Sequence, residues 1–236
     1  MVTGPTVIAW DLPTRLFHWT LVLGVVCAWV SFEFAEAFGD ERLVWHRWNG
    51  LFLLTLIVWR LLWGIVGPGP ARFSSFVSGP AAALGYARDL GRGRPRRFLG
   101  HNPLGAMMVL ALLAVAATIG TLGLFAVEEN DLATGPLYRL AGNDLAKVAT
   151  GWHRFLFEPV LVGLIAVHIA ANALYGFLKK EPLVAAMITG RKPADNYEDA
   201  DLARPLKRPA VRASVCLLLA ATLVFGGILA LGGKLP

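Results

Sequence analysis

The sequence predicts an all-α membrane protein with five spanning helices and no soluble domain. Of the 236 residues, 56% are hydrophobic and only 16% are charged. The mean hydropathy of +0.58 lies outside the range of ordinary soluble domains. A helix needs about 20 apolar residues to cross a bilayer. Five stretches are long enough: Leu16 to Phe34, Val44 to Val66, Leu104 to Val127, Phe155 to Leu178, and Ala213 to Leu231.

The first helix has a recognisable start. Asp11 and Pro13 are typical of a helix cap and a first turn. The apolar run that follows is long, carries Arg15 and His18 at its beginning, and lacks a small-residue cleavage site. We therefore expect a retained spanning helix rather than a cleavable signal peptide.

The later segments differ in charge. Residues 67–103 contain six arginines, and Pro80 to Leu90 within them predict a short amphipathic helix on the membrane surface. The third helix, residues 104–127, holds no ionisable residue in its apolar run and is expected to be structural. Pro159 predicts a kink in the fourth helix. The sequence gives no explanation for its neighbour Glu158.

The distribution of basic residues predicts the orientation. Arg15 and the connections 67–103 and 179–212 place fifteen Lys and Arg on one side of the membrane, against six on the other. The positive-inside rule then puts the N-terminus in the cytoplasm and the C-terminus outside. The net charge of +6 is thus an orientation signal and does not indicate nucleic-acid binding. The outer side suits a basic soluble partner, because its eight acidic residues outnumber its bases: Glu33, Glu36, Asp40, Glu41, Glu128, Glu129, Asp131 and Asp144.

Four histidines lie in or next to the predicted helices. His153 and His168 are 15 residues apart, which on a regular α-helix separates them by about 22 Å along the axis and about 60° around it. A histidine inside a spanning helix is costly and indicates a function with a partner. If the first, second and fourth helices are neighbours, His18 faces His168 near one membrane surface and His46 faces His153 near the other. His101 precedes Asn102 and Pro103 in a loop and is expected at the surface.

Two pairs at separate depths favour haem over zinc, because a zinc site gathers its ligands at one tetrahedral centre. A porphyrin between helices needs an imidazole on each face and small residues beside it, such as Gly50, one turn after His46. No Cys-x-x-Cys-His motif occurs, so the haem would be b-type. We therefore predict a four-helix haem-binding bundle with two haem b groups and a fifth, C-terminal helix. Packing or helix bonding is the alternative role for each single histidine.

Arginines near these histidines are candidates for binding haem propionates. Arg60 follows His46 by 14 residues and returns to nearly the same helix face at the inner depth, where a propionate needs a cation. The alternative is an arginine that snorkels to the interface. Arg15, Arg47 and Arg154, beside predicted ligands, are further candidates.

Several segments resemble the bacterial cytochrome b561 family, close to the b-type cytochrome subunits of nickel-iron hydrogenases. They are AWDLPTRLFHW (Ala9 to Trp19), WHRWNG (Trp45 to Gly50), RLLWG (Arg60 to Gly64), LGHNPLG (Leu99 to Gly105) and MITGRK (Met187 to Lys192). The resemblance covers about residues 8 to 192 and implies axial ligands on the first, second and fourth helices. Here these are His18, His46, His153 and His168. The chain then divides into a dihaem membrane domain, 1–192, and a basic linker with an extra spanning helix, 193–236.

The resemblance implies electron transfer between membrane quinone and a partner redox protein. For this chain we expect a dihaem b-type cytochrome of the bacterial inner membrane, in contact with lipid, with a c-type cytochrome or another redox protein as partner. Quinone oxidoreductase activity of its own is left open. One alternative is a cytochrome b subunit of a hydrogenase or other dehydrogenase. Another is a haem-free transporter or assembly protein. His101, Asn102 and Arg60 are candidate lining residues for a quinone headgroup, although a helix cap at Pro103 explains the first two equally well.

Overall fold

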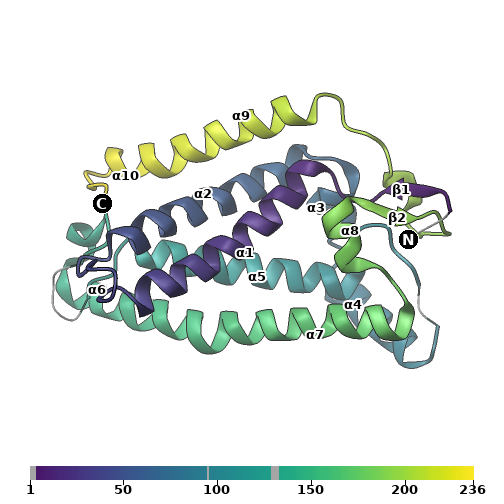
Figure 1. The fold of residues 1–236 in the computed structure, drawn as a ribbon, viewed down its shortest axis with the longest axis horizontal. Coiled ribbons are helices and arrows are strands. Elements are labelled where there is room, and N and C mark those ends of the chain that lie inside the picture. The colour runs from purple at the N-terminus through teal and green to yellow at the C-terminus, as the bar shows by residue number, and fades with distance from the viewer. Residues whose placement is uncertain (1–3, 95, 129–132) are drawn as a thin grey trace. The chain divides into compact units, whose positions relative to one another are not determined.

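A computed structural model describes residues 4–94, 96–128 and 133–236 of the chain (Figure 1). Five helical stretches in these residues are long and apolar enough to cross a membrane. The all-α membrane fold is therefore confirmed. The chain divides into two compact units, which comprise the described parts of Met1–Leu16, Leu61–Leu112 and Leu164–Ser214, and of Phe17–Arg60, Leu113–Gly163 and Val215–Pro236. Each unit is described by itself. Glu129 and Asp131, two of the acidic residues counted above, lie outside the described residues.

The spanning stretches are built as follows. The first three are α1 (Leu12–Glu33), α2 (Val44–Val66) and α5 (Pro103–Gly123). The fourth joins α6 (Tyr138–Phe155), the π-helical η2 (Leu156–Leu161) and α7 (Val162–Lys179). The fifth joins α9 (Pro209–Ala221), the π-helical η4 (Thr222–Gly226) and α10 (Gly227–Ala230). Between them lie η1 (Gly69–Ala71), α3 (Phe73–Phe76), α4 (Pro80–Gly91), α8 (Leu183–Thr189), η3 (Ala200–Leu202), β1 (Thr6–Ile8) and β2 (Arg191–Pro193).

Side-chain caps fix the starts of three helices. Asp11 Oδ1 accepts a hydrogen bond from the Thr14 amide at 3.3 Å, so the predicted cap of α1 is confirmed. Asp40 accepts the amides of Val44 and Trp45, both at 2.9 Å, at the start of α2. Asn102 Oδ1 accepts the Gly105 amide at 2.8 Å at the start of α5. Each cap satisfies amides that have no partner within the helix.

The fourth helical stretch is longer than predicted. It covers 42 residues from Tyr138 to Lys179, about twice the number that one bilayer crossing needs. Only its second half is continuously apolar, which is why the sequence pattern missed the first half. Gly142, with a φ of 71°, interrupts the helix early on.

A π-helical stretch, Leu156–Leu161, surrounds Pro159, where the sequence predicted a kink. Proline cannot donate an amide hydrogen bond, and its ring collides with the carbonyl four residues earlier. The wider π turn gives the proline ring more room, while the missing amide hydrogen bond is not restored. The 60° estimate for His153 and His168 assumed a regular α-helix, and the stretch between them is not one.

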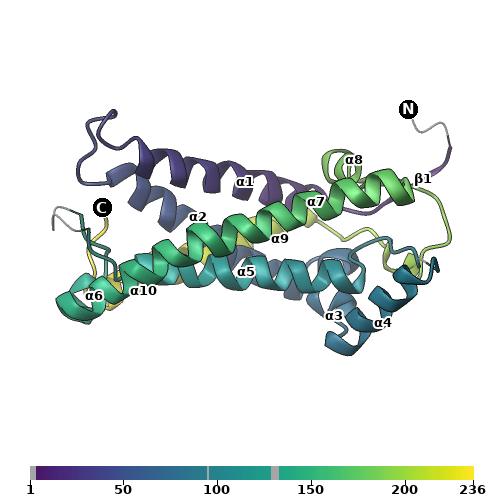
Figure 2. The ribbon, with the colours of Figure 1, turned by 90° about the horizontal axis from the view of Figure 1, so that it is seen from below.

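The first unit contains a two-stranded antiparallel sheet that the sequence did not predict. β1 pairs with β2, with Thr6 opposite Pro193 and Ile8 opposite Arg191, next to α8 (Figure 1). Strands of three residues are too short to show an alternating pattern. The connection between α2 and α5 forms α3 and α4 (Figure 2). The helix predicted from Pro80 is confirmed as α4.

Motif residues form the buried core of the first unit. Ala9, Trp10, Leu99 and Ala186 pack together. The Gly190 carbonyl accepts the amides of Ala9 and Trp10, at 2.9 and 3.1 Å. Gly190 has a φ of +82°, and a Cβ there would lie 2.7 Å from the Trp10 carbonyl oxygen. The MITGRK and AWDLPTRLFHW segments therefore fit together through a position that requires glycine.

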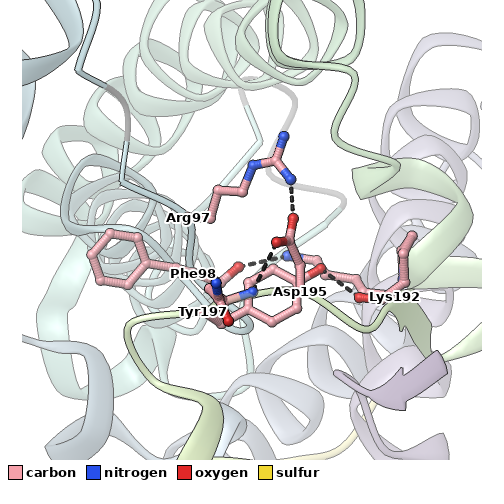
Figure 3. Close-up of polar contacts among 7 residues, drawn as sticks. Arg97, Phe98, Lys192, Asp195 and Tyr197 are labelled. Carbon is pink, nitrogen blue, oxygen red and sulfur yellow. Dashed lines mark hydrogen bonds and ion pairs between the residues drawn. The ribbon is translucent and has the colours of Figure 1, made fainter. Parts of the chain in front are cut away.

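A polar cluster attaches β2 to the segment before α5 (Figure 3). Lys192 is only 2% exposed, and its Nζ donates to the Phe98 carbonyl at 3.0 Å. The ammonium also lies 5.7 Å from the centroid of the Tyr197 ring. Arg97 forms an ion pair with Asp195 beside it. Burial lowers the pKa of Lys192 below its ordinary value of 10.5.

The fifth helix packs against α2 in the second unit. Its residues Val224 and Ile228 share a buried cluster with Leu51 and Leu54 of α2 and with Leu137. The rings of Trp48 and Phe225 lie 6.4 Å apart. Residues beyond 193 thus contribute to the core of this unit. The predicted domain boundary after residue 192 stays a prediction.

Candidate functional site

The second unit encloses a cavity of about 390 Å³, a volume typical of ligand and cofactor sites. Its walls come from α1, α2, α5, η2, the end of α6 and the segment between α5 and α6. They are mostly apolar, and Val25, Leu54, Ile57, Ile119 and Leu161 are examples. Two of the four predicted ligands, His46 and His153, also line this cavity.

His46 and His153 face each other across the cavity. Their ring centroids lie 6.2 Å apart, and the rings are steeply inclined to each other at 74°. His46 Nδ1 is 2.9 Å from the Ala28 carbonyl oxygen, and His153 Nδ1 is 2.9 Å from the Ile119 carbonyl oxygen. A carbonyl only accepts, so each Nδ1 carries the proton and donates it. The lone pair of each imidazole is then on Nε2.

This geometry fits two imidazoles that bind one metal from opposite sides. A histidine–metal bond of about 2 Å and a ring radius of about 1 Å place the two centroids about 6 Å apart. A hydrogen bond from the second ring nitrogen to a carbonyl is the usual way in which proteins orient metal-binding histidines. In the described ranges no group of three or more His, Cys, Asp or Glu would hold a bare metal ion. A metal already held by four macrocycle nitrogens needs only this pair.

Glycines leave space beside the histidines. Gly50 lines the cavity, and a Cβ added to it would meet no atom within 4 Å. Gly123 is different, because a Cβ there would lie 3.2 Å from His153 Cε1. Gly50 therefore supplies room, as predicted, and Gly123 lets α5 approach the His153 ring.

Charged residues line the same cavity. Arg154 Nη2 donates to Glu128 Oε1 at 2.8 Å, and its guanidinium lies 5.4 Å from the centroid of the Phe32 ring. Arg47, Glu33 and Glu158 also contribute to the lining. The Arg154–Glu128 pair was not predicted, since residues 26 positions apart give no local signal. Glu158, which had no explanation from the sequence, lies beside the cavity on the π-helical stretch.

The other predicted site residues are not brought together within one unit. His18 and Arg60 belong to the second unit and His168 to the first. His18 packs its ring at 5.0 Å from that of Trp19, and Arg60 is buried with 3% of its surface exposed. The Asn172 amide nitrogen lies 3.3 Å from His168 Nε2. The pairing of His18 with His168 and the propionate role of Arg60 therefore stay predictions.

His101 does not lie fully at the surface as predicted. Its ring is half-buried in the first unit, 4.8 Å from the Trp10 ring and 4.5 Å from the Phe76 ring. The aromatic residues come from segments far apart in sequence, which explains why a loop position looked exposed. Asn102 forms the cap of α5, as the alternative interpretation held.

The sequence profile of the prokaryotic cytochrome b561 family matches residues 9–190. The chain belongs to this family. A probable Ni/Fe-hydrogenase B-type cytochrome subunit of Azotobacter chroococcum mcd 1 is 24% identical over 213 residues, which are 78% of this chain and 87% of the relative. The corresponding protein of Azotobacter vinelandii is 23% identical over 214 residues, with the same coverage. No solved structure matches the chain.

This cytochrome is therefore a multi-pass membrane b-type cytochrome, and its family implies haem b. The cavity between His46 and His153 has the features that such a group requires. It has two imidazoles whose Nε2 atoms carry the lone pair, apolar walls and glycine where the space is needed.

Proposed function

We propose that this cytochrome holds two haem b groups and transfers electrons across the membrane between quinone and a partner redox protein. The main observation in support is that the ring centroids of His46 and His153 lie 6.2 Å apart. Membership of the cytochrome b561 family supports it independently.

A haem b with two histidine ligands supplies one-electron transfer and has no axial position left for dioxygen or substrate. The protein's own contribution is to orient the two imidazoles. Ala28 and Ile119 do so through their backbone carbonyls, which are fixed in helices. Apolar residues from several helices exclude water from the space between the rings.

The second haem would be held by His18 and His168, with Arg60 as the cation for a propionate. Four suitable histidines and two axial positions per iron support this number. The positive-inside rule supports an N-terminus in the cytoplasm and a C-terminus in the periplasm of a bacterial inner membrane. The His46–His153 site would then be the one on the outer side.

The partner is proposed on two grounds. The acidic outer side suits a basic protein such as a c-type cytochrome. The relatives are named as subunits of nickel-iron hydrogenases, which favours the alternative of a hydrogenase or other dehydrogenase subunit. Copurification of the natural partner from membranes distinguishes the two.

The test of the haem proposal is spectroscopic. A reduced-minus-oxidised spectrum of the purified full-length protein should show a b-type band, and a pyridine haemochrome assay should give two haems per chain. A ratio near one would contradict the two-pair arrangement. Absence of the b-type band would favour the haem-free transporter. Addition of a short-chain quinol should reduce the haems if quinone is the membrane substrate.

A further inference from the structure

We propose that Arg47 binds a propionate of the haem held by His46 and His153. The inference rests on the proposed function and assigns one residue to the carboxylate end of that haem.

Arg47 is a cation of the cavity wall that forms no ion pair with the other residues described. It lines the cavity next to His46 in sequence. Its Nε is buried, and among the described residues it has no hydrogen-bond partner. A guanidinium in a membrane protein is costly unless it is paired or reaches water.

One carboxylate acts on Arg47 but forms no ion pair with it among the described residues. Asp40 acts on Arg47 through its charge. Both Asp40 oxygens accept backbone amides at the start of α2, at 2.9 Å. Each Asp40 oxygen keeps a lone pair, so Asp40 caps α2 and still attracts Arg47. The guanidinium has five N–H donors and therefore retains donors for a further anion.

The other candidate arginines are occupied. Arg154 is paired with Glu128 at 2.8 Å and lies over the Phe32 ring. Arg15 belongs to the first unit and donates to the Ile188 carbonyl. Glu33 and Glu158, also in the cavity wall, have the same charge as a propionate and would repel it. Arg47 is therefore the best placed of these three arginines to bind a propionate of a haem between the His46 and His153 rings.

The test uses haem with and without charged carboxylates. Full-length protein carrying His168→Ala, so that only the His46–His153 site is filled, is prepared without haem and titrated with haem or with its dimethyl ester. With Arg47 present, haem should bind about ten- to a hundredfold more tightly than the ester, as expected for a charge-assisted hydrogen bond. Arg47→Leu should remove most of this preference, while Arg47→Lys should keep part of it.

Arg42 supplies the matched control, since it is an exposed arginine two residues before α2 and is not among the residues that line the cavity. Arg42→Leu should keep the full preference for haem. The midpoint potential of the bound haem should fall in Arg47→Leu, because a nearby positive charge favours the reduced iron, and should stay unchanged in Arg42→Leu. If Arg47→Leu and Arg42→Leu show the same preference and potential, the role of Arg47 is refuted. If neither haem nor its ester binds to the protein with Arg47 present, the proposed function itself fails.

Discussion

His46 on α2 and His153 on α6 face each other with ring centroids 6.2 Å apart. The carbonyls that orient them belong to two other helices, because Ala28 lies in α1 and Ile119 in α5. Four helices are therefore needed to place two rings. A backbone shift of any of them would change the separation or the tilt of the pair.

Replacement of the histidines by alanine should sort them into two pairs. His46→Ala and His153→Ala should each remove the same haem, because each change removes one axial ligand of one iron. His18→Ala and His168→Ala should both remove the other haem. His101→Ala should retain both, since its ring packs between Trp10 and Phe76. Spectra and haem counts of the five variants decide this. Grouping of His18→Ala with His153→Ala would show that the predicted pairing is wrong.

Crowding of His153 should weaken the same site. Gly123→Val places a Cβ 3.2 Å from His153 Cε1 and adds two methyl groups to that Cβ. Overpacking of this kind costs about 1–3 kcal/mol. We expect a several-fold loss of haem at the His46–His153 site, measured by haem content per chain. Gly151→Val is the control, because a Cβ at Gly151 meets nothing within 4 Å. Equal haem content in the two variants would contradict the prediction.

Arg60→Leu tests the predicted inner haem. The substitution should leave most haem in place but lower the potential of the haem assigned to His18 and His168, because a propionate would lose its cation. A redox titration monitored in the b-type absorption band measures both haems in one sample. An unchanged potential would favour the alternative of a snorkelling arginine.

Lys192 should make stability depend on pH. Burial lowers the pKa of Lys192 in the folded protein below 10.5. Between the lowered pKa and 10.5 the unfolded chain binds more protons than the folded one, so the stability rises with pH across this window. Lys192→Met should remove that rise. The apparent melting temperature in detergent, followed from about pH 7 upward, should increase relative to that of Lys192→Met. Parallel curves for the two proteins would contradict the role of Lys192.

The apolar runs predicted all five spanning helices, since length and composition alone decide whether a helix can cross a membrane. Asp11 also revealed the cap of α1, because a cap depends on residues three positions apart. The depths of His46 and His153 in their predicted helices already indicated that the two rings lie close together. This inference used only their distances from the helix ends.

Other features depend on contacts that no local pattern records. The π-helical stretch around Pro159 changes the angular relation between residues before and after it, and a proline alone does not specify it. The burial of His101 depends on Trp10 and Phe76, and the engagement of Arg154 on Glu128. Each involves segments that meet only in the folded chain.

The pairing of β1 with β2 joins residues 6–8 to residues 191–193, so the hydrogen bonds close the chain between them into a loop. The pairing extends one step further, because the Ala194 amide donates to the Pro5 carbonyl at 2.8 Å. The segment that the family profile matches, residues 9–190, lies between these two strands in the sequence. A short peptide bridge could therefore join residue 5 to residue 194 covalently, and new chain ends could be opened elsewhere. The fifth helix follows residue 194, so in such a circular permutant it would have to be supplied as a separate polypeptide. The closed loop and the fifth helix can therefore be made as two chains.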